Sequence, residues 1–148
     1  MKLSTKGRYG LRAMVDLASY CEEGPVSIMA ISKRQDISER YLEQIVSKLK
    51  KAELVKSIRG AGGGYVLARE AKDISVGDVL RALEGDFMAV ECRGFEKGEG
   101  CTVKDVCVTK YVWQKINESI NQTVDEIKLE TLVEESKKKC CCMNKMEA

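Results

Sequence analysis

Apolar residues recur at three- and four-residue spacing along the first third of the chain, which is the period of an amphipathic helix. The pattern predicts helices from Ser4 to about Tyr20, from Ser27 to Arg34 and from Ser38 to Lys51. Each segment begins at a serine, whose hydroxyl can accept a hydrogen bond from N–H groups of the first turn. The third segment separates its two faces most clearly. Its apolar face consists of Tyr41, Leu42, Ile45, Val46 and Leu49.

After the third helix the pattern changes to that of strands. Residues 54–59 and 65–68 are rich in apolar and β-branched side chains and flank a glycine-rich segment, residues 60–64. Two short strands around glycines predict a β-hairpin with a flexible tip. The glycines are not a nucleotide-binding loop, because no Lys-Ser or Lys-Thr pair follows them and Tyr65 stands where a dinucleotide fingerprint needs its third glycine.

The remaining chain predicts a capped helix, a loop and a long helix. Ser75 caps the first of these helices, which stops at Gly85, and a cysteine-bearing loop runs from about Phe87 to Cys107. The apolar seam of the long helix can pair with its copy across a two-fold axis or pack against its own domain. That seam consists of Trp113, Ile116, Ile120, Val124 and Ile127.

Together these elements predict a mainly α fold with a small β-hairpin wing, a winged helix-turn-helix domain followed by a long C-terminal dimerisation helix. The length of 148 residues suits one such protomer rather than two large domains. We assign the chain to a winged helix-turn-helix domain, a cysteine-bearing cluster-binding loop, dimerisation helices and a flexible tail. These segments are residues 1–85, 86–109, 110–136 and 137–148, respectively.

Charge is unevenly distributed between the two parts of the chain. Residues 1–60 carry 12 basic and 7 acidic side chains, a net charge of +5, whereas residues 61–148 carry 13 and 16, a net charge of −3. A basic segment suits phosphate contact, although a solvated basic surface has the same composition. The chain shows neither a run of about 18 apolar residues nor a signal-peptide start. We therefore expect a cytoplasmic protein that does not enter a membrane.

The exposed face of the third helix has the chemistry of a major-groove reader of double-stranded DNA. Gln44 can pair bidentately with adenine and Arg40 with guanine. Glu43 can accept a hydrogen bond from cytosine and repels phosphates elsewhere, so we expect it to act by exclusion. In the wing, an arginine among glycines suits a narrow minor groove, and a lysine adds a phosphate contact. The other predicted DNA-binding residues are Ser38, Tyr41, Lys56, Arg59 and Gly60.

Three cysteines in the loop form a candidate metal site. Cys92, Cys101 and Cys107 are nine and six residues apart, in a segment that contains several glycines. Three thiolates suit an iron–sulfur cluster or zinc, and the residues alone do not separate the two. Cys21 has the character of a small buried residue. The chain has no histidine and no recognisable catalytic pair, so we expect no enzymatic activity.

Four segments together resemble the family of winged-helix transcriptional regulators that includes IscR, NsrR and CymR. The resemblance covers Met1 to about Val133 and implies a homodimer, with the third helix in the major groove, the Arg59 wing in the minor groove and the long helix at the dimer interface. The segments are Leu3-Ser4-Thr5-Lys6-Gly7-Arg8-Tyr9, Tyr41-Leu42-Glu43-Gln44, Arg59-Gly60-Ala61-Gly62-Gly63-Gly64-Tyr65 and Val79-Leu80-Arg81-Ala82-Leu83-Glu84-Gly85.

The IscR-like members of this family have three cysteines at the matching place, which favours an iron–sulfur cluster over zinc. The resemblance implies a regulator that senses cluster status through a 2Fe–2S cluster and controls genes of cluster biogenesis. The alternative is a CymR-like repressor of cysteine metabolism that is controlled by a protein partner, zinc or thiol oxidation.

The ligand set departs from the family at one position. Lys110 stands where IscR has its histidine ligand, so the fourth ligand is unassigned. Candidates are a loop carboxylate, an exogenous thiol, or the tail if it folds back onto the loop. The side chains concerned are Glu91, Glu96, Asp105, Cys140, Cys141 and Cys142.

Overall fold

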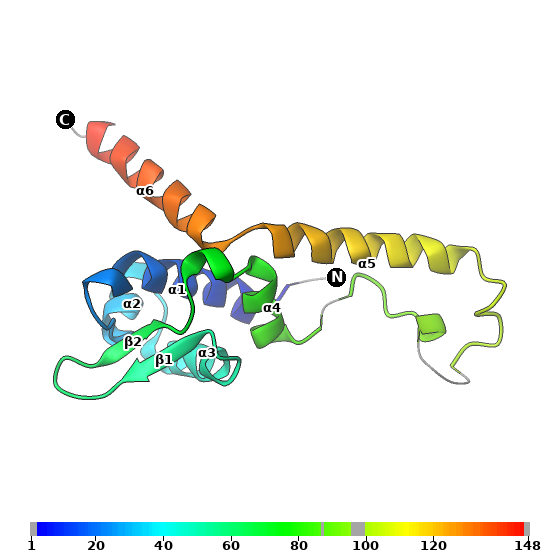
Figure 1. The fold of residues 1–148 in the computed structure, drawn as a ribbon, viewed down its shortest axis with the longest axis horizontal. Coiled ribbons are helices and arrows are strands. Elements are labelled where there is room, and N and C mark those ends of the chain that lie inside the picture. Colours follow the sequence, from blue (N-terminus) through cyan, green and yellow to red (C-terminus); the bar gives the residue numbers. More distant parts are fainter. Residues whose placement is uncertain (1–2, 87, 96–99, 147–148) are drawn as a thin grey trace.

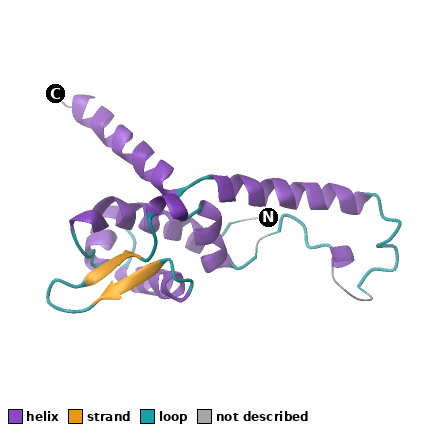
Figure 2. Cartoon of the chain, in the orientation of Figure 1, coloured by secondary structure: helices purple, strands orange, loops and turns teal. Residues whose placement is uncertain are grey.

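The computed structural model describes residues 3–86, 88–95 and 100–146. Its elements follow the predicted order, and two long helices end the chain (Figures 1 and 2). Short single-turn helices lie at Cys21–Glu23, Ala71–Asp73 and Arg93–Phe95. The main elements are α1 (Thr5–Tyr20), α2 (Ile28–Gln35), α3 (Glu39–Lys51), β1 (Val55–Ile58), β2 (Gly64–Leu67), α4 (Val76–Glu84), α5 (Thr109–Glu126) and α6 (Leu129–Met146).

The serines predicted to begin helices do so. The hydroxyls of Ser4, Ser27 and Ser38 accept hydrogen bonds from backbone N–H groups in the first turns of α1, α2 and α3. At α4, Ser75 and Asp78 form a reciprocal capping box. The starts of four helices are therefore confirmed, and each is fixed by local hydrogen bonds.

One hydrophobic core holds the helix-turn-helix together. α1 runs through its centre and contacts α2, α3, α4 and α6. Each fully buried large side chain contributes about 1.5 to 3 kcal/mol relative to exposure. Because the apolar face of α3 belongs to this core, its polar face is directed outward. The largest fully buried side chains include Met14, Leu17, Ile31, Leu42, Ile45, Leu49, Leu54 and Ile74.

A buried ion pair joins α1 to α2. The Asp16 side chain is 1% exposed and accepts hydrogen bonds from Nε and Nη2 of Arg34, at 2.9 and 2.7 Å, and from Nε2 of Gln35 at 2.9 Å. The guanidinium of Arg34 also lies 4.0 Å from the ring centroid of Tyr20. These contacts compensate the buried carboxylate and fix α2, the helix that precedes α3 in the helix-turn-helix.

The predicted hairpin is confirmed. β1 and β2 pair antiparallel, with Val55 opposite Leu67 and Ile58 opposite Gly64. Backbone hydrogen bonds between Val26 and Tyr65 attach the hairpin to the segment before α2. Gly63 is required at the tip, because a Cβ there would lie 2.3 Å from the carbonyl oxygen of Ile58. The wing is thus placed beside the helix-turn-helix (Figure 2).

α5 extends away from the winged domain, and the cysteine loop lies near its N-terminal end (Figure 1). The C-terminal half of α5 packs on α4, because Ile120 and Val124 contact the small core of Val76 and Leu80. Part of the predicted seam therefore packs on its own domain. The N-terminal half has an exposed apolar surface, which includes Tyr111, Val112 and Ile116 at 64%, 45% and 37% exposure.

Two helix boundaries differ from the sequence prediction. The seam was expected to continue through Ile127, but α5 ends at Glu126 because the next residues pair with the start of α4. The Ile127 carbonyl accepts a hydrogen bond from the N–H of Val76, and the N–H of Leu129 donates to Ile74.

The tail, residues 137–148, was expected to be flexible, yet α6 continues through residue 146. Lysine, glutamate and methionine favour helix, and no glycine or proline interrupts them. None of the helices within the described residues is long and apolar enough to cross a bilayer.

Candidate DNA interface and cysteine loop

The polar face of α3 is fully available to a ligand. Arg40, Glu43 and Gln44 are all exposed, and their spacing of three and four residues places them on one side of the helix. The Ser38 hydroxyl caps the N-terminal end of this helix, and Arg40 and Glu43 lie close to that end. Tyr41, also predicted to bind DNA, is half-buried, and its ring packs edge-on against Tyr9 at a centroid distance of 6.0 Å. This contact joins the first turn of α3 to α1.

A positive patch extends beyond the predicted residues. The pKa of Lys48, which lies on α3, is lowered by contact with the Lys6 ammonium and by its charge. The two like charges therefore lie close together on α1 and α3, near the Glu84 carboxylate, whose charge partly offsets the lowering of the Lys48 pKa. Lys6 belongs to a different helix, so the sequence did not connect it with α3.

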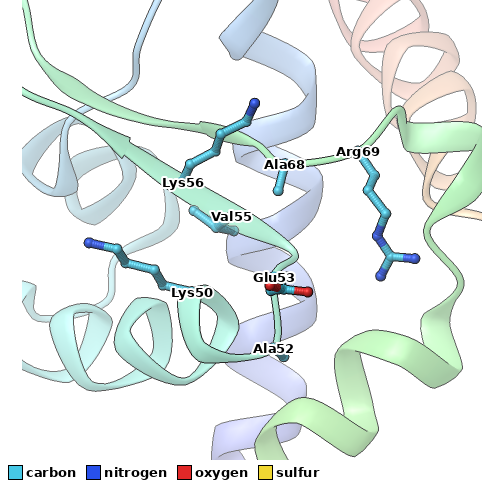
Figure 3. A pocket seen from close by; sticks show the side chains of 7 residues that line it. All are labelled: Lys50, Ala52, Glu53, Val55, Lys56, Ala68 and Arg69. Atoms are coloured by element: carbon cyan, nitrogen blue, oxygen red, sulfur yellow. The ribbon is translucent and has the colours of Figure 1, made fainter.

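The wing presents a second basic surface. Lys56 is exposed on β1, while Arg59 and Gly60 are exposed in the turn, where Gly60 has a φ of +117° that favours glycine. Between the end of α3 and the hairpin lies an open groove of about 690 Å³ (Figure 3). Sequence reasoning selected only one of its three basic residues. The groove is lined by Lys50, Ala52, Glu53, Val55, Lys56, Ala68 and Arg69.

Lys50 and Arg69 were missed because they reach the groove from separate elements. Lys50 lies in the last turn of α3 and donates a hydrogen bond from Nζ to the Ser57 hydroxyl at 2.9 Å. Arg69 follows β2 on the other side of the groove (Figure 3). The local sequence signal for the basic groove is the lysine-rich last turn of α3, which contains Lys48, Lys50 and Lys51.

The three loop cysteines are half-buried free thiols. Cys107 precedes α5, and its sulfur lies 3.1 Å from the Thr109 hydroxyl. The pKa of Cys107 is lowered by that hydroxyl, by backbone N–H groups of Lys110 and Thr109 and by the Lys110 charge, against a smaller effect of burial. This environment favours the thiolate, which is the form that binds metals.

The other two thiols are not gathered with Cys107 into one centre. Within residues 3–86, 88–95 and 100–146, no group of three or more Cys, Asp and Glu side chains has a metal-binding arrangement. Cys92 packs against Gly94, where an added Cβ would lie 3.4 Å from the Cys92 sulfur and 3.7 Å from Cδ of Lys110. Lys110 therefore lies near two of the three cysteines. The donor set fits an iron–sulfur cluster in its chemistry, three thiols on one loop.

The candidates for a fourth ligand receive no support in this structure. Glu91 and Asp105 are exposed, and Glu96 lies outside the described residues. Cys140, Cys141 and Cys142 lie on α6, at the opposite end of the molecule from the loop (Figure 1). In this structure these three tail cysteines thus do not complete the loop site of their own chain.

The loop starts at a junction that contacts both α1 and α3. Oε1 of Glu84, the last residue of α4, accepts hydrogen bonds from the N–H groups of Ser4 and Gly7, at 3.1 and 3.0 Å, and from the Ser4 hydroxyl. Nζ of Lys48 donates to the Leu83 carbonyl at 3.4 Å. Burial tends to raise the pKa of Glu84, but the hydrogen bonds from Ser4 and Gly7 together outweigh it and the pKa is lowered.

Glycines make this junction possible. A Cβ at Gly7 would lie 2.6 Å from Oε1 of Glu84, and a Cβ at Gly10 would lie 2.0 Å from Cδ1 of Leu83. The glycines of α1 therefore allow α4 to approach closely. Local spacing does not reveal this contact, because its partners are about 80 residues apart.

A helix-turn-helix with an exposed polar helix and a basic wing is typical of a DNA-binding transcriptional regulator. The chain belongs to the Rrf2 family, described as an iron-dependent transcriptional regulator, whose model matches residues 3–135.

Relatives and solved structures agree with this assignment. The chain is 44% identical over 133 residues to the HTH-type transcriptional regulator IscR of Serratia proteamaculans, covering 90% of this chain and 79% of the relative. It is similar to the structure of T. potens IscR, with 48% identity, a TM-score of 0.73 and coverage of 92% and 88% of the two chains. It is also similar to CymR, the global cysteine regulator of B. subtilis, with 43% identity, a TM-score of 0.76 and coverage of 90% and 97%. The protein is a transcriptional regulator of the IscR type.

Proposed function

We propose that this protein binds its operator as a homodimer, with an affinity set by a 2Fe–2S cluster held by Cys92, Cys101 and Cys107, and that it regulates genes of iron–sulfur cluster biogenesis. The observation that carries the proposal is the position of the cysteine loop. The loop joins α4, whose end contacts α3, to α5, which offers an exposed apolar face. A change in the loop therefore acts on both the reading helix and the dimer contact.

The cluster ligands are proposed from chemistry and placement. The three thiols are free, half-buried and on one loop, and the IscR relatives make a cluster the expected occupant. When bound, the cluster would join three points of the loop and so order it. Ordering of the loop on cluster binding is the proposed switch.

Glu84 and Lys48 would carry the change to DNA. Glu84 is adjacent to Gly85, where the loop begins, and its carboxylate holds the N-terminal turn of α1. The Leu83 carbonyl accepts from Lys48 on the exposed side of α3. Movement of the last turn of α4 therefore changes the position of α3 or the availability of Lys48 to phosphate. Coupling of this kind is typically about 1 to 3 kcal/mol, or about 5- to 150-fold in affinity.

On DNA, α3 would lie in the major groove. Arg40 and Gln44 would contact guanine and adenine, and Glu43 would exclude bases that offer it no donor. Arg59 and Gly60 would enter the minor groove at the wing. Lys56, with Lys50 and Arg69 around the groove of Figure 3, would contact the phosphate backbone.

The dimer would form along α5. Tyr111, Val112 and Ile116 form an exposed apolar stripe on the N-terminal half of α5, whereas the C-terminal half packs on α4. Such a stripe is typical of a surface covered by a second copy. Pairing across a two-fold axis would set the spacing between the two copies of α3, which determines the spacing of the operator half-sites.

The cluster is tested by its colour and composition. Protein purified without oxygen should show a visible absorption band and contain iron and acid-labile sulfide. Cys92→Ala should lose all three, while the control Cys21→Ala, which removes a thiol outside the loop, should retain them. Colourless wild-type protein that also fails to take up iron and sulfide on reconstitution would exclude the cluster.

The second candidate is a CymR-like repressor of cysteine metabolism. The similarity to the CymR structure favours it, with 43% identity and a TM-score of 0.76. In that case zinc, thiol oxidation or a protein partner would control the regulator. Colourless protein that holds zinc, or whose DNA affinity changes on thiol oxidation alone, would support this second function.

A further inference from the structure

A second group of cysteines lies far from the loop, on α6. Cys140, Cys141 and Cys142 are consecutive, exposed and free. Three lysines, residues 137–139, precede them on the same helix. The function proposed above uses none of these residues. We refer to residues 140–142 as the cysteine triplet.

Helix geometry separates the three sulfurs. Successive residues of an α-helix are about 100° apart, so Cys140 and Cys142 are on nearly opposite sides. Adjacent Cα atoms are about 3.8 Å apart, below the usual range for a disulfide. The triplet also forms no metal-binding group within the described residues. While α6 is intact, these thiols are therefore available to react with a molecule from outside.

Two members of the triplet line an open pocket. Cys140 and Cys141 share a space of about 690 Å³ with Lys137, Arg34 and Tyr20, between α6 and the helices α1 and α2. The carboxylate of Asp16 also borders it, but that group is buried and paired with Arg34 and Gln35. The exposed charges at the pocket are thus basic, and Cys142 does not line it.

We propose that Cys140 and Cys141 form a site of thiol–disulfide exchange with an anionic, low-molecular-weight disulfide. The cysteine thiolate attacks one sulfur of the disulfide, a new S–S bond forms, and the old S–S bond breaks. The released half leaves as a thiolate and takes up a proton. The protein thiol is oxidised and the released half is reduced, so no further oxidant is required. The bound half lies in the pocket beside Lys137 and Arg34.

The position of this site connects it with the helix-turn-helix. Arg34 is the residue that holds the buried carboxylate of Asp16 and so fixes α2 to α1. A negatively charged adduct in the pocket is placed to interact with the same guanidinium. The site is independent of the cluster loop, which lies at the other end of the molecule (Figure 1).

The test uses the reduced full-length protein and oxidised glutathione, an anionic peptide disulfide. Adduct formation is followed at each cysteine by peptide mass spectrometry without reduction. Cys140 and Cys141 should react about two- to fivefold faster than Cys142, as expected for the effect of one exposed charge pair. A neutral disulfide, 2-hydroxyethyl disulfide, should react at all three cysteines at similar rates.

A matched pair of lysine variants tests the role of the pocket. Lys137→Gln should remove the preference for Cys140 and Cys141, whereas Lys138→Gln should leave it, because Lys138 pairs with Glu135 and does not line the pocket. Circular dichroism checks that both variants retain the helix. Equal glutathione rates at Cys142 and Cys140, a preference that persists in Lys137→Gln, or a disulfide between two copies as the main product would overturn the proposal.

Discussion

Individual side chains on α3 and around the wing determine what the protein offers to DNA. Arg40 and Gln44 are exposed and suited to base edges, while Lys50 and Lys56 lie beside a groove suited to phosphates. Tyr41, in contrast, is half-buried and packs against Tyr9. We therefore expect the residues of this surface to divide into base readers, phosphate contacts and supports, and each group predicts a different mutant behaviour.

Arg40→Ala and Gln44→Ala should each weaken operator binding by about 1 to 3 kcal/mol and relax the preference at particular base pairs, because bidentate contacts are lost. Lys50→Gln should instead weaken binding to all sequences alike and reduce the slope of log K against log salt by about 0.9. Fluorescence anisotropy with operator variants at several salt concentrations measures both effects. An unchanged base preference in the two alanine variants would show that α3 is not the reading helix.

At the scale of elements, the contact between the end of α4 and the helices α1 and α3 is the central feature. It joins residues that lie far apart in the chain, through Glu84 with Ser4 and Gly7 and through Leu83 with Lys48. α5 continues from the other end of the cysteine loop and carries the exposed apolar stripe. The loop is therefore attached to the proposed reading helix on one side and to the proposed dimer helix on the other.

The Glu84 contact makes stability depend on pH. Because the folded-state pKa of Glu84 is lowered, its carboxylate stabilises the fold above the unfolded pKa of about 4.3, and this contribution is lost as pH falls through the folded-state pKa. Glu84→Gln should be less stable than wild type near pH 7, and the difference should shrink towards pH 3. Urea unfolding of both proteins at a series of pH values measures this difference in the free energy of unfolding. A difference that does not change with pH would contradict the role of the charge.

A charge on the stripe of α5 should separate the protomers. Ile116→Glu is expected to shift the protein from dimer to monomer, because a carboxylate would be buried at an apolar interface without a partner. Gln114→Glu adds the same charge on the opposite side of the helix and should leave the dimer intact. Sedimentation velocity separates the two states. If both variants remain dimers, the interface lies elsewhere.

For the whole molecule, the sequence predicted features that depend on local pattern better than features that depend on contacts between distant residues. The four serine caps, the helix periods and the glycine hairpin are local signals, and the structure confirms the elements that they predict. The end of α5 was misplaced because Ile127 continues the helical spacing, while its carbonyl instead accepts from Val76, about 50 residues earlier. The tail was expected to be flexible because it is polar, whereas α6 continues through residue 146 over helix-forming residues.

The same distinction between local signals and long-range contacts holds for the candidate site. The exposed face of α3 and the loop cysteines could be read from spacing, because both lie within short segments. The positions of Arg69 and Lys6 could not be read from spacing, since only folding brings Arg69 beside the wing and Lys6 beside α3. Nor could spacing alone show that Glu84 holds α1, because that contact depends on two glycines that allow the helices to approach.

The proposed switch is tested most directly by comparing the operator affinity of cluster-loaded and cluster-free protein at one fixed salt concentration, with Glu84→Gln measured in parallel. We expect the two forms of wild type to differ by about 5- to 150-fold in Kd, and the variant, which takes up the same iron and sulfide, to show a smaller difference. Equal Kd values for loaded and cluster-free wild-type protein on every operator tested would contradict the claim that the cysteine loop sets DNA affinity.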